Sequence, residues 1–179
     1  MTIDPALRAR LESFLRPLYQ DLDGVSRFDD VERVEAIARR FYVGDLAFDL
    51  LLLFHGLGRW LEKVGNLSRA VLTIGLSEGE LRGTAASIRR LDDPSTDAER
   101  AVAAALLIDS AGVRGLAERL ARSRREGSSV LDVVRHALAD AEEPAWLPVS
   151  ARPLLMKRRE ARRDVCRKIL DEMGLEDLG

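Results

Sequence analysis

Apolar residues recur at helical spacing along almost the whole chain of 179 residues, and this pattern most limits how the chain can fold. Between residues 31 and 41 they form one face of an amphipathic helix, and residues 46–54 are apolar nearly all round, as in a central buried helix. No stretch alternates apolar and polar residues as a half-buried strand does. The sequence also lacks internal repeats and low-complexity linkers, so we predict one all-α domain, a helical bundle over residues 1–179.

Capping residues mark the ends of these helices. Proline at the first helical position follows an aspartate at Asp4-Pro5, and residues 77–80 and 96–99 have the Ser/Thr-x-x-Glu form of a capping box. Pro17 is expected to end or kink the first helix, because proline lacks the N–H that a helix interior needs. The predicted helices cover about 5–18, 29–41, 45–54, 68–74, 78–91, 97–108, 112–126, 129–141 and 151–173, with Gly127 and Gly174 just beyond two of the ends.

Composition excludes several classes of protein. The 28 Lys+Arg and 30 Asp+Glu residues give a formal charge of −2, so nothing global favours nucleic acid or an anionic membrane as a partner. A single cysteine, Cys166, excludes a disulfide within the chain and a cysteine-based zinc cluster. No segment has the pattern of a signal peptide, and the apolar run 46–54 is too short to cross a bilayer. We therefore expect a cytoplasmic protein without membrane contact.

Three separated stretches carry a family signal. Residues 23–34 align without a gap to an Asp-Gly-Ser-His-Asp segment, two aromatic-rich positions and then His-(Ile/Val)-Glu-Arg-Val. Residues 52–59 are similar to an apolar helix that ends in a His-Asp pair, and residues 105–112 to an Ala-Asp-Arg-Leu-Asp-Ala-x-Gly run. These three patterns are those of the HD-domain metal-dependent phosphohydrolases, which the chain resembles over roughly residues 10–173. The resemblance implies an all-α bundle of the HD-domain type.

The metal-binding positions of that family are mostly replaced. The family holds a divalent metal with a first His, the adjacent His-Asp pair and a later Asp, because the metal polarises the phosphoryl oxygen and activates water. In this sequence those positions hold Asp30, His55, Gly56 and Leu106, and a further family histidine is Ser26. The resemblance therefore implies a degenerate member with no catalytic residue, no metal ligand set and no cofactor.

What remains is a remnant pocket. Asp30 suits the first turn of its helix, and His55 suits the edge of a core with a hydrogen bond to Asp30 or to a backbone carbonyl. A divalent metal held weakly by Asp30 and His55, with Asp109 as a third ligand, is the alternative. The residues that we assign to the remnant pocket are Asp30, His55, Arg59 and Asp109.

The resulting expectation is a binding or regulatory scaffold without hydrolase activity. Its partner is an unknown protein, a second copy in a homodimer, or a small phosphorylated ligand. The alternative is an active phosphohydrolase on nucleotides or related phosphate esters with a rebuilt metal site.

Basic residues cluster at 122–125 and 157–168, where we expect solvated faces. On the last helix, Leu155, Val165, Ile169 and Met173 are expected to form the packing stripe. Cys166 beside this stripe is expected to be a small buried hydrophobe. Nucleic acid is not an expected partner, since no aromatic residues are interleaved with the basic ones.

Overall fold

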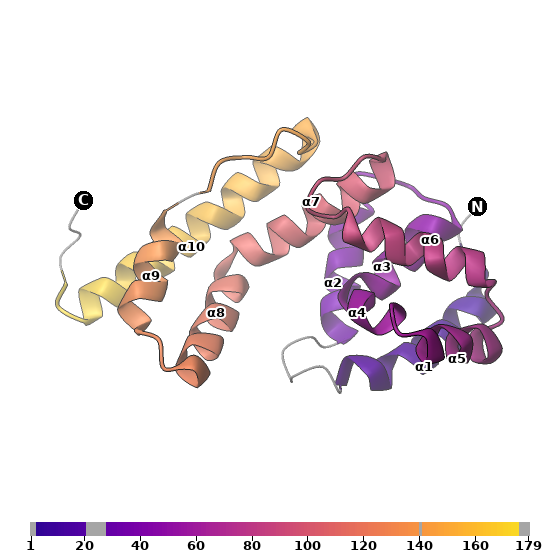
Figure 1. Cartoon of the computed structure of the whole chain (residues 1–179). Coiled ribbons are helices and arrows are strands. Elements are labelled where there is room, and N and C mark those ends of the chain that lie inside the picture. Colours follow the sequence, from indigo (N-terminus) through magenta and orange to yellow (C-terminus); the bar gives the residue numbers. More distant parts are fainter. Residues whose placement is uncertain (1–2, 21–27, 140, 176–179) are drawn as a thin grey trace. The chain divides into compact units, whose positions relative to one another are not determined.

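The computed structural model describes residues 3–20, 28–139 and 141–175, and the chain divides into two compact units, Met1–Ala105 and Leu106–Gly179. All regular elements in the described residues are helices, which confirms the predicted all-α class (Figure 1). The HD-domain type and the single-domain organisation stay predictions. The first unit holds α1 (Pro5–Gln20), α2 (Phe28–Ala38), α3 (Leu46–Phe54), α4 (Gly58–Leu61), α5 (Val64–Ile74), α6 (Glu78–Arg89) and most of α7 (Asp97–Ala111). The second holds the end of α7 with α8 (Val113–Glu126), α9 (Val130–Leu138) and α10 (Arg152–Glu172).

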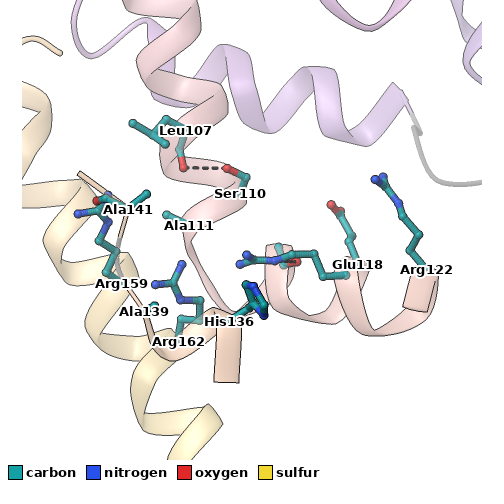
Figure 2. A pocket seen from close by; sticks show the side chains of 12 residues that line it. Leu107, Ser110, Ala111, Glu118, Arg122, His136, Ala139, Ala141, Arg159 and Arg162 are labelled. Atoms are coloured by element: carbon teal, nitrogen blue, oxygen red, sulfur yellow. Dashed lines mark hydrogen bonds between the residues drawn. The ribbon is translucent and has the colours of Figure 1, made fainter. Parts of the chain in front are cut away.

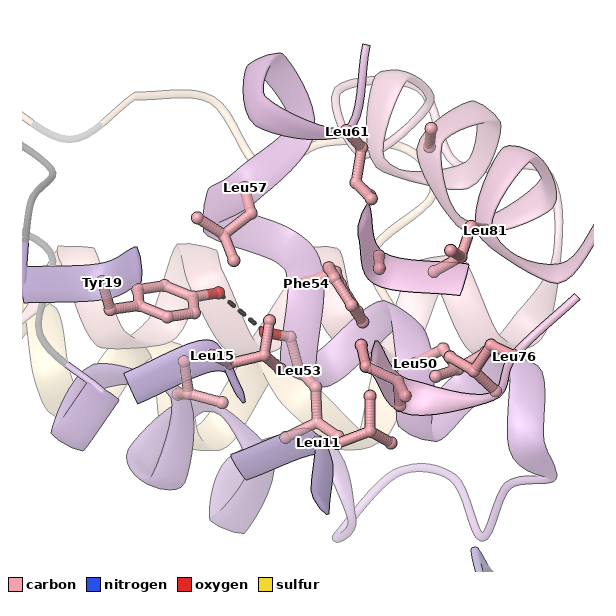
Figure 3. Close-up of a cluster of buried hydrophobic side chains, with 14 of the residues drawn as sticks. Leu11, Leu15, Tyr19, Leu50, Leu53, Phe54, Leu57, Leu61, Leu76 and Leu81 are labelled. Carbon is pink, nitrogen blue, oxygen red and sulfur yellow. Dashed lines mark hydrogen bonds between the residues drawn. The ribbon is translucent and has the colours of Figure 1, made fainter. Parts of the chain in front are cut away.

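Helix α3 is the centre of the first unit. Every side chain from residue 48 to residue 54 is buried, as the all-round apolar pattern predicts. Helices α1, α2 and α6 pack around α3. Figure 3 shows part of this core, in which Leu50 and Leu53 of α3 join Leu11 and Leu15 of α1.

Asp49 is the acidic residue within this apolar helix, and its carboxylate is paired. The side chain is buried, and its oxygens accept hydrogen bonds from the Ile3 amide at 2.9 Å and from Arg39 Nη2 at 2.6 Å. Arg39 Nε also donates to Glu35 Oε1 at 2.7 Å. Because a buried carboxylate is tolerated only when it is hydrogen-bonded and paired, these contacts explain how Asp49 fits into the core.

Pro17 does not end the first helix, as we expected it could, because α1 continues to Gln20. A proline inside a helix removes one hydrogen bond and costs about 3 kcal/mol. The turn beyond Pro17 is held by Tyr19, which is buried and donates a hydrogen bond from its hydroxyl to the Leu53 carbonyl at 2.8 Å. Tertiary contacts of this turn outweigh the local preference.

Both predicted capping boxes are present. The Ser77 amide donates to Glu80 Oε2 at 2.7 Å, and the Glu80 amide donates to Ser77 Oγ at 3.2 Å. The same exchange joins Thr96 and Glu99, at 3.2 Å in each direction. Glu99 is buried; burial alone would raise the pKa of its carboxyl, but hydrogen bonds from Arg90 and from the Ser95 segment lower this pKa to about 2.

The second unit is built around the contacts of α9 with α8 and α10. Its core contains Leu116, Val134, Ala137, Cys166 and Leu170, so Cys166 is buried as predicted. The turn from α7 into α8 requires a glycine at position 115, because a Cβ there would lie 1.9 Å from the Ser110 carbonyl oxygen.

Among the described residues, no helix combines the length and the apolar character needed to traverse a lipid bilayer.

Candidate functional site

Asp30 lies in the first turn of α2 and forms an ion pair within its own helix. Arg33 Nη2 donates to Asp30 Oδ1 at 2.7 Å, and the Asp30 side chain is only 17% exposed. A carboxylate in the first turn also interacts favourably with the helix dipole. Asp30 therefore has a structural role in α2. The preceding family positions 23–27, Ser26 among them, lie outside the described residues.

His55 follows directly after α3 and is fixed by the backbone of that helix. Its Nδ1 lies 2.7 Å from the Leu52 carbonyl oxygen. Because a carbonyl only accepts hydrogen bonds, this contact requires the proton to be on Nδ1. The orientation of the ring is thus set by α3 itself.

A tyrosine that the sequence analysis did not single out lies beside His55. The ring centroids of Tyr19 and His55 are 6.5 Å apart, and the Gly56 amide donates to the Tyr19 hydroxyl at 3.3 Å. A Cβ on residue 56 would lie 2.8 Å from Tyr19 Cε1, so the ring occupies the space that a larger residue there would need. The spacing of Leu11, Leu15 and Tyr19, four residues apart each time, was the signal that Tyr19 faces the core.

Tyr19 also brings Asp30 into this group. Burial raises the pKa of the Tyr19 hydroxyl well above its usual range, and the negative charge of Asp30 raises it further, whereas the hydrogen bond from Gly56 lowers it. The phenol therefore stays protonated, as its donation to Leu53 requires. The structure thus places Asp30 and His55 near the same tyrosine.

The other two predicted pocket residues lie elsewhere in the chain. Arg59, on the short helix α4, is exposed. Asp109 is half-buried on α7 and belongs to the second unit. Nowhere in residues 3–20, 28–139 and 141–175 do three or more His, Cys, Asp or Glu side chains come close enough to hold a metal ion.

The second unit contains a cavity of about 400 Å³ with a strongly basic lining (Figure 2). The acidic residue of the lining is Glu118, whose carboxylate already accepts from Arg114 Nε at 2.9 Å. The basic residues of the lining come from three helices: Arg119 and Arg122 from α8, His136 from α9, and Arg159 and Arg162 from α10.

The packed face of the last helix differs from the predicted stripe, because two of these arginines belong to it. Arg159 and Arg162 are each only 5% exposed, and they alternate with buried Leu155, Cys166 and Leu170 on one face of α10. Met173, which we expected in the stripe, is 47% exposed. The solvated face predicted for the basic residues is wrong for this pair, because the aliphatic part of an arginine packs among apolar groups while its head reaches a polar site.

Hydrogen bonds hold the basic side chains in place. Arg159 Nη2 donates to the Ala141 carbonyl at 2.9 Å, and Arg119 Nε donates to the Gly115 carbonyl at 3.2 Å.

Burial raises the pKa of the Cys166 thiol, and the positive charges of Arg162 and Arg119 oppose this shift only in part. Cys166 is thus a neutral core thiol rather than a nucleophile.

Comparison with known proteins found no match among protein-family models, curated proteins or solved structures. The HD-domain resemblance therefore depends on the residues quoted for it.

Proposed function

We propose that this protein is a degenerate HD-type protein that acts by binding, as a scaffold or regulator, and not by metal-dependent hydrolysis. The observation that carries the proposal is the packing of the Tyr19 ring against Gly56, next to His55. In the family that the sequence resembles, the residue after this histidine is an aspartate that binds the metal. Here an aspartate would have to displace a ring that hydrogen bonds hold on both sides of its hydroxyl.

The remaining donors do not fit a catalytic metal. Asp30 and His55 supply two potential ligands, and catalytic zinc sites use three protein ligands with an open position for water. The Asp30 carboxylate is engaged by Arg33. A hydrogen bond from His55 Nδ1 to the Leu52 carbonyl is compatible with metal ligation through Nε2, so it is the small number of potential ligands that argues against a metal site. The Asp30–Arg33 pair lies within α2 and the His55–Leu52 contact lies at the end of α3, so both support the local structure of the first unit. We therefore derive no catalytic step through a metal.

Metal content tests the proposal directly. The protein is purified without chelator or affinity tag, dialysed against manganese, magnesium or zinc, and analysed by elemental mass spectrometry. We expect no metal to be retained in stoichiometric amount. Metal near one equivalent that is lost in His55→Ala would overturn the proposal.

A phosphate-release assay on a panel of nucleotides distinguishes this proposal from the alternative of an active phosphohydrolase. Metal-stimulated release that His55→Ala abolishes would establish an active phosphohydrolase with a rebuilt site. Absence of release, in protein that circular dichroism shows to be folded, supports the proposed loss of hydrolysis.

A further inference from the structure

The cavity of the second unit concentrates basic side chains on a concave surface. Four arginines and one histidine line it, against one glutamate that is already paired with Arg114. We propose that this cavity is a binding site for a small molecule that carries phosphate groups. The site shares no residue with the Tyr19–His55 region, so it stands or falls independently of the proposed loss of hydrolysis.

The arginines are suited to phosphate by their chemistry. A guanidinium group presents a planar fork of N–H donors that matches phosphate oxygens in a bidentate manner, and it keeps its charge at all physiological pH values. Arg119 and Arg122 are one turn apart on α8, and Arg159 and Arg162 are one turn apart on α10. A ligand with two or more phosphate groups can therefore meet donors from both helices.

The buried pair is also pre-organised. Arg159 and Arg162 are fixed within the packed face of α10, and Arg159 is further held by the Ala141 carbonyl. Side chains that are already ordered lose less conformational entropy when a ligand binds. Figure 2 shows both side chains in the lining to which α9 contributes His136.

The size and the remaining lining favour a small molecule. A volume of about 400 Å³ is within the range of small-ligand pockets. Leu107, Ala111 and Ala139 provide an apolar portion of the wall, where a less polar part of such a ligand fits. A nucleotide or another phosphorylated metabolite has this combination of groups.

Calorimetric titration with inorganic pyrophosphate tests the site in the full chain. We expect binding at constant ionic strength, and we expect Arg119→Gln combined with Arg122→Gln to weaken it by about tenfold or more, since hydrogen bonds to charged groups are lost. Both arginines are exposed, so the variant should fold. Arg124→Gln is the matched control, because Arg124 is an exposed residue of α8 outside the cavity lining. Absence of binding, or equal weakening by the control, would overturn the proposal.

The two histidines provide a second readout, since one lies in each unit. In NMR spectra, pyrophosphate should shift the ring signals of His136, which lines the cavity, and leave those of His55 in place. Shifts at His55 alone would place the ligand in the first unit and contradict the proposal.

Citrate and a polyglutamate peptide identify the class of ligand. Binding of either one as tightly as pyrophosphate, at the same ionic strength, would overturn the assignment to phosphate. Weaker binding of both supports it, and nucleoside diphosphates then show whether the apolar wall adds affinity.

Discussion

At the scale of single residues, Gly56 shows how the absence of a side chain at one position lets a neighbouring ring pack there. The glycine leaves room for the Tyr19 ring, and its amide donates to the Tyr19 hydroxyl. The glycine at position 56 and the buried tyrosine at position 19 are therefore parts of one packing arrangement. A change at position 56 has to be judged together with position 19.

Gly56→Ala should destabilise the first unit by about 1–3 kcal/mol, the usual range for an overpacked core. The new methyl group would lie 2.8 Å from Tyr19 Cε1, and the ring cannot move without losing its hydrogen bond to Leu53. Urea unfolding measures the free energy. The penalty should largely disappear in a Tyr19→Ala background.

The control for this change is Gly83→Ala, in the exposed interior of α6. A Cβ there meets no atom within 4 Å, so the substitution should stabilise the helix by up to about 1 kcal/mol. Equal stability of Gly56→Ala and the wild type would show that the ring does not restrict this position.

At the scale of elements, Glu99 joins two helices. Its carboxylate accepts hydrogen bonds from Arg90 after α6 and caps the start of α7 through Ser95 and Thr96. Its pKa in the folded protein is about 2, below the ordinary 4.5, so the folded state favours the ionised form. The stabilisation is complete above pH 4.5 and is lost as the pH falls toward 2.

Glu99→Gln should therefore lower the free energy of unfolding at neutral pH by about 1–3 kcal/mol, because it removes a charge from buried hydrogen bonds. The difference from the wild type should shrink as the pH is lowered toward 2. Denaturant unfolding over a pH series measures both. Asp97→Asn, at an exposed pair with Arg100, is the control and should change stability by less than about 1 kcal/mol. A difference that does not change with pH would contradict this role of Glu99.

The helices themselves were largely predictable from sequence, and the exceptions have physical causes. Capping boxes and glycine ends are local signals, so α6, α7 and α8 begin and end close to their predicted positions. The extension of α1 past Pro17 was not predictable, because it depends on the contact between Tyr19 and Leu53 across the core. The surroundings of His55 were not predictable in detail either, because Tyr19 enters them from another helix.

The burial of Arg159 and Arg162 was partly visible in the sequence. They follow Leu155 and precede Cys166 and Leu170 at helical spacing, which places them on the packed face. The charge of arginine led to the opposite assignment. Only the packing of α8 and α9 around this face shows that a cavity lies beside it.

At the scale of the whole molecule, a ligand of the second unit should be detectable as increased stability of the native chain. A ligand that binds only the folded state at about 100 times its Kd stabilises that state by about 2.7 kcal/mol. Pyrophosphate should therefore raise the melting temperature by several degrees as its concentration increases.

The Arg119→Gln, Arg122→Gln variant should lose this shift, and Arg124→Gln should keep it. Scanning calorimetry at constant ionic strength makes the comparison. A shift of the same size with sodium sulfate would show a general salt effect instead of occupancy of the cavity.

The position of Cys166 has a practical consequence. It is the single thiol of the chain, it is buried in the core of the second unit, and burial raises its pKa. An aromatic disulfide reagent can react with it only when that core opens, so the labelling rate in native buffer reports the free energy of local opening without any denaturant. The labelling rate thus reports opening of the second unit alone, because the first unit contains no cysteine.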